Sequence, residues 1–455
     1  MAGSTPRCSM VEEMSSTPTQ LQSTKPASAG RAFQSSNFRR YQLARVMVII
    51  GAEAQTIAVA WQVYQLTHSA LSLGYTGLAL FLPGLLFVLP AGHAADRYNR
   101  RNLIVMCYVL QAVCTTLLFW FAWHGAASVL PIYGVLFLIG TGRAFSGPAS
   151  SALLPQLVPK DHFVNAVTWG ATIFQIANTA GPMLGGLLFV LPLQGRLQSL
   201  SGAPIVFLLT LATMLWFIAL VSSLTVTPNP MDKRAFTMKT VLAGLHYVWH
   251  AKLLLGSITL DLFAVLLGGA VALMPIFAQD ILHTGPSGLG LLRAAPSVGA
   301  LVISLTMTRF PIKRGAGARM LTCVGIFGLA TIVFGLSRSL WLSVAALMVV
   351  GASDMVSVVI RSSVLQLATP PEMRGRVSAV NWLFIGASNE FGEFESGVTA
   401  QWWGAVRAVV IGGIGSLVVT ALWTGLFPAL RNAGALTAEA LMQSNVEQTT
   451  EEPID

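Results

Sequence analysis

The feature of this sequence that most limits its fold is a near-continuous succession of apolar stretches. A helix needs about 20 apolar residues to cross the hydrocarbon core of a bilayer. Twelve stretches of roughly that length occur, at residues 41–65, 73–93, 102–124, 129–153, 163–191, 203–226, 253–279, 288–308, 319–336, 341–366, 377–399 and 406–427. Only 10% of the residues are charged, against about 25% in soluble domains. The sequence therefore predicts an all-α membrane protein with twelve transmembrane helices. It excludes a soluble enzyme, a one-span receptor and a disulfide-rich secreted scaffold.

The positions of Lys and Arg predict how the helices are oriented. If the amino terminus is cytoplasmic, the cytoplasmic segments hold 20 of the 27 basic residues and the opposite loops hold 3. Basic residues favour cytoplasmic loops, so we expect both termini in the cytoplasm of a bacterial cell, with the chain in the inner or plasma membrane. This distribution also accounts for the net charge of +9. Nucleic acid is therefore not an expected partner.

The chain is expected to divide into two similar halves. The longest polar break between spans separates six helices from six, and we expect a disordered tail at 1–40, a six-helix bundle at 41–226, a cytoplasmic linker at 227–252, a second bundle at 253–427 and a cytoplasmic tail at 428–455. The segments LLPQLVPKDHFVNAVTW and VLQLATPPEMRGRVSAVNW resemble one another at a separation of about 212 residues, and LGYTGLALFLPG and LGLLRAAPSVG at about 215. Two parallel six-helix repeats are typical of transporters, whose substrate path lies between the halves.

The loop after the second expected span reads AGHAADRYNRR. A basic loop that only sets topology would explain its arginines but not its acid. The pattern resembles the loop 2–3 signature of the major facilitator superfamily, which reads Gly, x, Leu, Ala, Asp, Arg, x, Gly, Arg, Arg. The matching residues are Gly92, Ala95, Asp96, Arg97, Arg100 and Arg101. In that family the Asp pairs with arginines and a facing helix end and so latches the outward-facing state, and the resemblance implies the same gate here.

Two positions of this loop depart from the family pattern. Ala94 replaces the usual Leu, and Asn99 replaces the usual Gly. Asn also adopts the left-handed turns that Gly favours, so we expect the second exchange to be tolerated.

The fourth span, GTGRAFSGPASSA, carries Arg143. A guanidinium at the centre of a membrane costs at least about 2.5 kcal/mol, so Arg143 is expected to face a cavity or a partner. The segment resembles the span-4 motif of the family, with Arg143 and Gly147 matching and Ser146 in place of the usual Gln. The resemblance implies a role in proton coupling; the alternative is an ion pair that holds helices together.

The fifth span contains ANTAGPMLGG, with Gly181, Pro182, Gly185 and Gly186. Glycines four residues apart let another helix pack closely, which is a common use of small residues in membranes. The order Gly, Pro, x, x, Gly, Gly also resembles the antiporter signature of the family. It favours export by exchange with protons over import.

The remaining charges in the spans define a candidate proton-coupling cavity. Together with Arg143 its members are Glu53, Asp261, Arg293, Asp354, Arg361, Glu390, Glu393 and Glu395. Of these, Glu395 is expected to point away from the face that Glu390 and Glu393 share. Asp354 and Arg361 are two turns apart on one helix, so each would need another partner or a water bridge. Glu390 and Glu393 can share a helix face, where two like charges make one carboxylate easier to protonate. Taken singly, each acid is better explained by a structural pair. As a set they are expected to include a proton carrier, for which Glu53, Asp261 and Glu390 are the candidates.

Residues 38 to 430 resemble a branch of bacterial siderophore and drug exporters in this superfamily, on segments such as LDLFAVLLGGAVALMPIFAQDIL and RAFSGPASSALLPQLVP. The resemblance implies a secondary active transporter that exports a siderophore or an amphiphilic drug by alternating access, driven by protons, without cofactor or metal and as a monomer. The alternative on the same fold is an importer of a small polar metabolite. A membrane-embedded enzyme or sensor is disfavoured because P-loop, HExxH and Gly-x-Ser-x-Gly motifs are missing.

Overall fold

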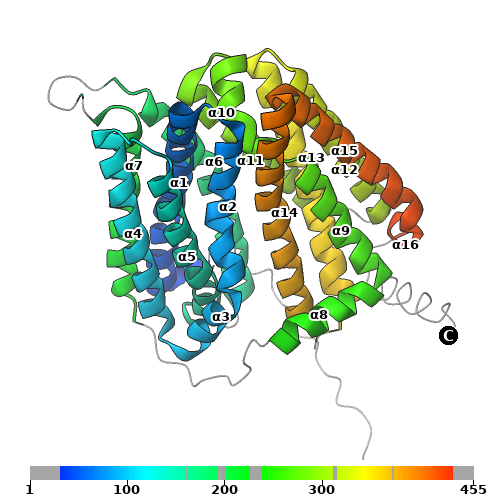
Figure 1. Cartoon of the computed structure of the whole chain (residues 1–455). Coiled ribbons are helices and arrows are strands. Elements are labelled where there is room, and N and C mark those ends of the chain that lie inside the picture. Colours follow the sequence, from blue (N-terminus) through cyan, green and yellow to red (C-terminus); the bar gives the residue numbers. More distant parts are fainter. Residues whose placement is uncertain are drawn as a thin grey trace, which may run out of the picture.

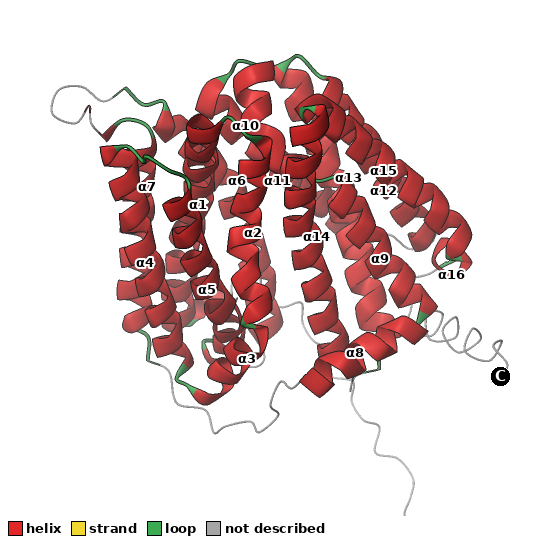
Figure 2. Ribbon diagram, viewed as in Figure 1, coloured by secondary structure: helices red, strands yellow, loops and turns green. Residues whose placement is uncertain are grey.

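The computed structural model describes residues 31–159, 162–192, 198, 200–225, 238–310, 315–370 and 373–433. Within these ranges the regular structure is helical, and Figure 2 contains no strand. Long helices stand side by side and form two groups, one from each half of the sequence (Figure 1). The predicted all-α class is confirmed for the described residues.

The amino-terminal half contributes six spans. Its helices are α1 (Ser36–Thr67), α2 (Ala70–Leu86), α3 (Val88–Arg97), α4 (Arg100–His124), α5 (Leu130–Leu153), α6 (Phe163–Phe189) and α7 (Ala203–Ser222). Helices α2 and α3 form one span that bends by 58°. Pro83 lies one turn before this bend and supplies no backbone N–H to the helix, which is a common cause of a kink.

The carboxyl-terminal half starts with an amphipathic helix and then adds six spans. Its helices are α8 (Met238–His250), α9 (Lys252–Leu267), the 3₁₀ turn η5 (Ala270–Leu273), α10 (Met274–Ile276), the π turn η6 (Phe277–Ile281), α11 (Gly285–Arg309), α12 (Ala316–Leu336), α13 (Leu340–Ala368), α14 (Arg374–Trp403), α15 (Ala405–Leu426) and α16 (Pro428–Arg431). The segment from α9 to η6 is one span whose helix is interrupted at Gly268 and Gly269.

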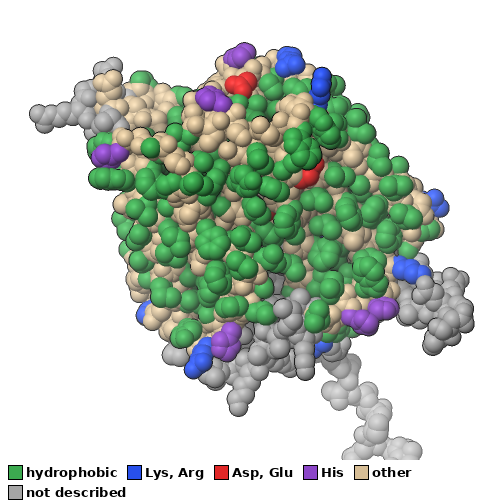
Figure 3. All heavy atoms as spheres, in the orientation of Figure 1, with side chains coloured by type: hydrophobic (Ala, Val, Ile, Leu, Met, Phe, Trp, Pro, Cys, Tyr) green, Lys and Arg blue, Asp and Glu red, His purple; other side chains and the backbone are tan. Residues whose placement is uncertain are grey.

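The dimensions of the helices suit a membrane. Within the described residues, eight spans are long and apolar enough to cross a bilayer, and the bent pair α2–α3 would be a ninth. Helices α5, α6 and α14 pack beside these nine spans in the same bundles. Together they agree with the twelve transmembrane helices predicted from the sequence. On the face visible in Figure 3, hydrophobic side chains form a broad band and most charged side chains lie toward the two ends. The chain is therefore built as a multi-pass membrane protein.

The two halves meet along two pairs of helices, α2 with α14 and α6 with α11. Glycines permit the close approach in both pairs: a Cβ on Gly290 would lie 3.0 Å from the Cα of Gly186, and a Cβ on Gly397 would lie 3.0 Å from the Cα of Gly74. Gly74 and Gly290 are 216 residues apart, and Gly186 and Gly397 are 211 apart. These separations match the predicted repeat, so the two contacts are related by its pseudo-symmetry.

Three features of the fold differ from the sequence predictions by more than a few residues at a helix end. Helix α1 begins at Ser36 rather than at residue 41, because the side chain of Ser35 caps it by accepting a hydrogen bond from the Phe38 N–H at 3.4 Å. The linker expected at 227–252 contains α8, which packs against α14 and α9. The seventh span, expected to be continuous over 253–279, is interrupted at Gly268 and Gly269.

The halves are joined at the end of the bundle where α1 is followed by α2, which we call the α1–α2 end. Ile57 and Trp61 of α1 belong to one buried hydrophobic cluster with Leu273, Met274 and Phe277 of the other half. This cluster seals that end of the contact between the halves.

Polar contacts reinforce this closure. The Tyr64 hydroxyl donates a hydrogen bond to Asp280, and the Gln65 amide donates one to Gln279 at 3.0 Å. Ser69 donates to Gln401 at 3.1 Å. All three bonds join residues of opposite halves at the α1–α2 end.

Candidate functional site

A cavity of about 190 Å³ lies between the two halves, and we call it the interface cavity. It contains five of the charged side chains predicted from the sequence, carried by four helices. They are Glu53 on α1, Arg143 on α5, Arg293 on α11, and Glu390 and Glu393 on α14. Because these helices come from both halves, a change in how the halves pack would change the distances between these charges.

The charges of the interface cavity face one another without direct pairing. Among the described side chains, no ion pair within 4.0 Å joins them. Arg143 is exposed, and the Nε atom of Arg293 is buried without a hydrogen-bond partner. The guanidinium groups therefore remain open to an anion, a water molecule or a rearranged carboxylate. This arrangement does not match the alternative in which Arg143 only forms a structural ion pair.

Glu390 and Glu393 approach one another beside Gly77 of α2. A Cβ on Gly77 would lie 3.0 Å from the Oε2 atom of Glu390 and 2.8 Å from that of Glu393. The missing side chain thus leaves the space that both carboxylates use. Glu395, also on α14, lines neither of the cavities described here. The two carboxylates share a helix face, as their spacing predicts.

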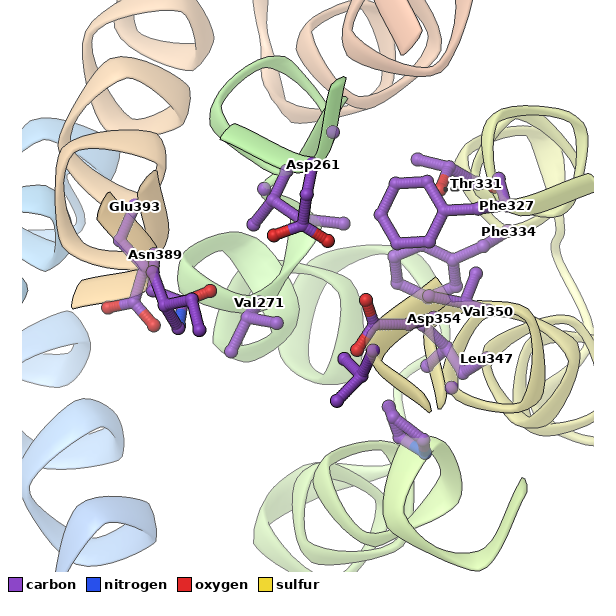
Figure 4. Close-up of a pocket in the computed structure, with 18 of the residues that line it drawn as sticks. Asp261, Val271, Phe327, Thr331, Phe334, Leu347, Val350, Asp354, Asn389 and Glu393 are labelled. Atoms are coloured by element: carbon purple, nitrogen blue, oxygen red, sulfur yellow. Dashed lines mark hydrogen bonds between the residues drawn. The ribbon is translucent and has the colours of Figure 1, made fainter. Parts of the chain in front are cut away.

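A second cavity, of about 400 Å³, lies within the carboxyl-terminal half, and we call it the C-half cavity. Asp261 of α9 and Arg361 of α13 form a buried ion pair on its wall. Asp354 points toward the cavity from α13 (Figure 4). Arg361 is thus paired with an acid 100 residues away in the sequence rather than with Asp354 on its own helix.

The two cavities share a wall. Glu390 and Glu393 line both of them, so these carboxylates stand between the interface cavity and the C-half cavity. Eight of the nine charges predicted for the site line one cavity or both, and the prediction is wrong for Glu395. These eight comprise five carboxylates and three guanidinium groups, which leaves two carboxylates without a matching cation. Uncompensated charge is costly inside a membrane, so this surplus favours protonation or a bound cation.

The predicted gate in the loop between α3 and α4 is described only in part. Arg100 donates to the carbonyl of Ala152 at 3.0 Å, and Arg101 donates to that of Leu224 at 3.0 Å. Both contacts lie within the amino-terminal half. Gly92 and Arg97 lie in α3, and the side chain of Asp96 lies outside the described residues. The latch remains a prediction.

Asn99, which stands where the family pattern has Gly, does not adopt a left-handed conformation. Its φ and ψ angles are −61° and 114°, and its side chain caps α4 by accepting a hydrogen bond from the Arg101 N–H at 3.1 Å. Asn replaces Gly here because it is a good N-cap residue.

The glycines of the predicted antiporter motif face two different helices. A Cβ on Gly181 would lie 2.9 Å from the Ile50 carbonyl oxygen and one on Gly185 would lie 2.8 Å from that of Ala54, so both glycines pack against α1. Gly186 instead packs against α11 of the other half. Pro182 lies within α6 between these contacts. The motif thus connects the helix that carries Glu53 to the contact between the halves.

Several residues of the site were not singled out from the sequence. Gln55, Thr56 and Thr76 line the interface cavity beside the charges. Tyr64 and Asp280 join the halves. The positions of Gln55, Thr56 and Thr76 could have been found from the sequence, because they are polar residues within apolar spans. The contact of Tyr64 with Asp280 could not, because it depends on packing between distant helices.

Comparison with known proteins identifies the family. Residues 27–452 match the family described as transmembrane secretion effector. The chain is 28% identical to the enterobactin exporter EntS of Citrobacter koseri over 386 residues, which cover 84% of this chain and 86% of the relative. It is equally similar, at 28% over the same shares of both chains, to EntS of Escherichia coli O1:K1 / APEC.

Solved structures share the fold. A bacterial homologue of the human lysosomal transporter Spinster, in an inward-facing and unoccupied conformation, aligns with a TM-score of 0.66 at 15% identity, covering 91% of this chain and 98% of that one. The human organic anion transporter MFSD10 aligns with a TM-score of 0.57 at 16% identity, covering 86% and 99%. The chain belongs to the transmembrane secretion effector family of the major facilitator superfamily and is a membrane transporter.

Proposed function

We propose that this protein is a proton-coupled exporter of a siderophore or an amphiphilic drug-like molecule. The interface cavity carries this proposal, because Glu53, Arg143, Arg293, Glu390 and Glu393 converge there from both halves. Acids and bases that face one another without ion pairs can exchange partners when a proton or a substrate enters. The likeness to enterobactin exporters and the glycine motif of α6 support the outward direction.

Alternating access is the mechanism that we infer for this exporter. From the distribution of basic residues we infer that both termini lie in the cytoplasm. The closed α1–α2 end would then face away from the cytoplasm, as it does in inward-facing and occluded conformations. The halves would then rock about the glycine contacts of α2 with α14 and of α6 with α11. The proposed transporter acts as a monomer, takes its energy from the proton gradient without a cofactor, and catalyses no chemical reaction.

An importer of a small polar metabolite is the second candidate. The side chains of Gln55, Thr56 and Thr76 support it, because they add hydrogen-bonding groups to the interface cavity. Such groups suit a small polar solute better than they suit an apolar one. The two candidates differ in the direction of transport.

Everted membrane vesicles with an acidic lumen test both candidates. We expect vesicles that contain the protein to accumulate enterobactin or ethidium, because protons leaving the lumen drive the substrate inward. Nigericin, which collapses the pH gradient in potassium buffer, should abolish this accumulation, and vesicles without the protein provide the control. Accumulation that survives nigericin would exclude proton coupling. Uptake seen only in right-side-out vesicles would favour the importer.

A further inference from the structure

The C-half cavity has the size and the walls of a small-molecule site. Its volume of about 400 Å³ lies within the usual range for ligand pockets, about 300–1,000 Å³. Much of its wall is apolar: Phe327 and Phe334 of α12 lie on one side, with Val350 and Leu347 of α13 beside them (Figure 4). The interface cavity, by contrast, is smaller and is lined by charges and polar groups.

Asp354 is the acid without an ion pair that lines the C-half cavity alone, since Glu390 and Glu393, which are also without an ion pair among the described residues, line both cavities. One face of α13 lines the cavity through Leu347, Val350, Asp354, Val358 and Arg361, which recur every three or four residues. Arg361 is already engaged by Asp261. Among the described residues, no ion pair within 4.0 Å involves Asp354. The aspartate is therefore free to pair with a cationic ligand.

The break in the seventh span adds a second source of negative potential. Helix α9 ends at Leu267, and Gly268 and Gly269 continue along the cavity wall before η5 begins. The carboxyl end of a helix carries a partial negative charge. The last carbonyl groups of α9 are not free ligands, because that of Ala264 accepts hydrogen bonds from the Gly268 N–H and the Ser416 hydroxyl, and those of Leu266 and Leu267 lie against Gly392 and Gly412. The helix end therefore contributes a partial charge to the cavity rather than a set of ligands.

The combination of walls and charges defines the class of ligand. Asp354 and the end of α9 attract a positive charge, while the rings of Phe327 and Phe334 accept an apolar or cationic group. The described residues contain no cluster of three or more His, Cys, Asp and Glu side chains that could hold a metal ion. We propose that the C-half cavity binds an organic cation with an apolar or aromatic body, whose positive charge pairs with Asp354.

Binding and transport can be tested separately. The inference that this cation is a transported substrate rests on the proposed exporter function, whereas binding to the cavity does not. Equilibrium binding requires no proton gradient. A protein that binds the cation but does not transport it would contradict the proposed function alone, and a protein that exports enterobactin without binding the cation would contradict this inference alone.

The test is equilibrium binding of radiolabelled tetraphenylphosphonium to the full-length protein in lipid nanodiscs. We expect saturable binding that Asp354→Asn weakens at least about tenfold, because the variant loses the charge that pairs with the ligand. Asp354→Glu should retain most of the affinity. Glu395→Gln, which removes an acid of the same half that lines neither cavity, should bind as the wild type does. Benzyltrimethylammonium should displace the label, and its neutral isostere neopentylbenzene should not.

Three results would overturn the inference: no saturable binding to the wild type, equal affinity of the wild type and Asp354→Asn, or equal displacement by the neutral isostere. Thermal unfolding checks that each variant is folded. If Asp354→Asn does not fold, the Val350→Trp variant replaces it in the binding assay. The Trp side chain fills the cavity, while the charge of Asp354 is retained. Val350→Trp should also lower the affinity at least about tenfold, and unchanged binding would contradict the inference.

Discussion

Asp261→Asn is expected to lower the free energy of unfolding by about 3 kcal/mol, because it leaves the buried guanidinium of Arg361 without its charge partner. The side chains of Asp261 and Arg361 are only 8% and 3% exposed, so water cannot replace the lost partner easily. The measurement is a denaturant titration of the protein in detergent micelles, followed by tryptophan fluorescence. Arg361→Gln should have a similar effect.

The double variant and a matched acid serve as controls for this prediction. Asp261→Asn combined with Arg361→Gln should recover most of the lost stability, because no charge then remains buried alone. Asp354→Asn removes an acid from the same cavity but breaks no ion pair, so its effect should stay below about 1 kcal/mol. If Asp261→Asn is as stable as the wild type, the pair does not hold α9 to α13.

Replacing both Glu390 and Glu393 by Gln should reduce proton-driven transport in everted vesicles at least about tenfold. The Oε2 atoms of both carboxylates lie against Gly77, where two adjacent negative charges repel one another in a medium of low dielectric constant. Such a pair is well suited to share and release a proton as the halves move. The measurement compares ethidium accumulation with and without a pH gradient.

A second assay separates coupling from a general loss of function. Exchange of labelled for unlabelled ethidium without a gradient should continue in the double variant, since substrate passage needs no net proton transfer. Glu395→Gln, on the same helix but outside both cavities, should accumulate ethidium as the wild type does. Full gradient-driven accumulation by the double variant would exclude these two carboxylates as proton carriers.

The fold could be predicted because the bilayer imposes a strong constraint on the sequence. Twelve apolar stretches and their repeat gave the architecture, and the cost of charge in a membrane pointed to cavity-lining residues. The charged residues singled out on that ground line one or both of the two cavities, except Glu395, which lines neither. The loop pattern that ends in Arg100 and Arg101 identified the superfamily, although the role of the loop as a gate remains a prediction.

The details of the site depended on packing between distant helices, which spacing does not reveal. Arg361 pairs with Asp261 on another helix and not with Asp354 two turns away. Gly77 makes room for two carboxylates from the other half of the chain. By contrast, the interruption of the seventh span could have been predicted from the sequence, because two consecutive glycines, Gly268 and Gly269, favour a break in a helix.

Passage of the substrate through the interface cavity requires the α1–α2 end to open. The side chains of Gln65 and Gln279 meet across that end at 3.0 Å. Gln65→Cys and Gln279→Cys, in a protein whose four native cysteines are replaced by Ala, should be joined by a bifunctional methanethiosulfonate reagent that spans the length of the two lost side chains. We predict that this cross-link stops ethidium accumulation in everted vesicles and that a reductant restores it, while either single variant treated with the reagent is unaffected. Undiminished accumulation by the fully cross-linked protein would contradict this account.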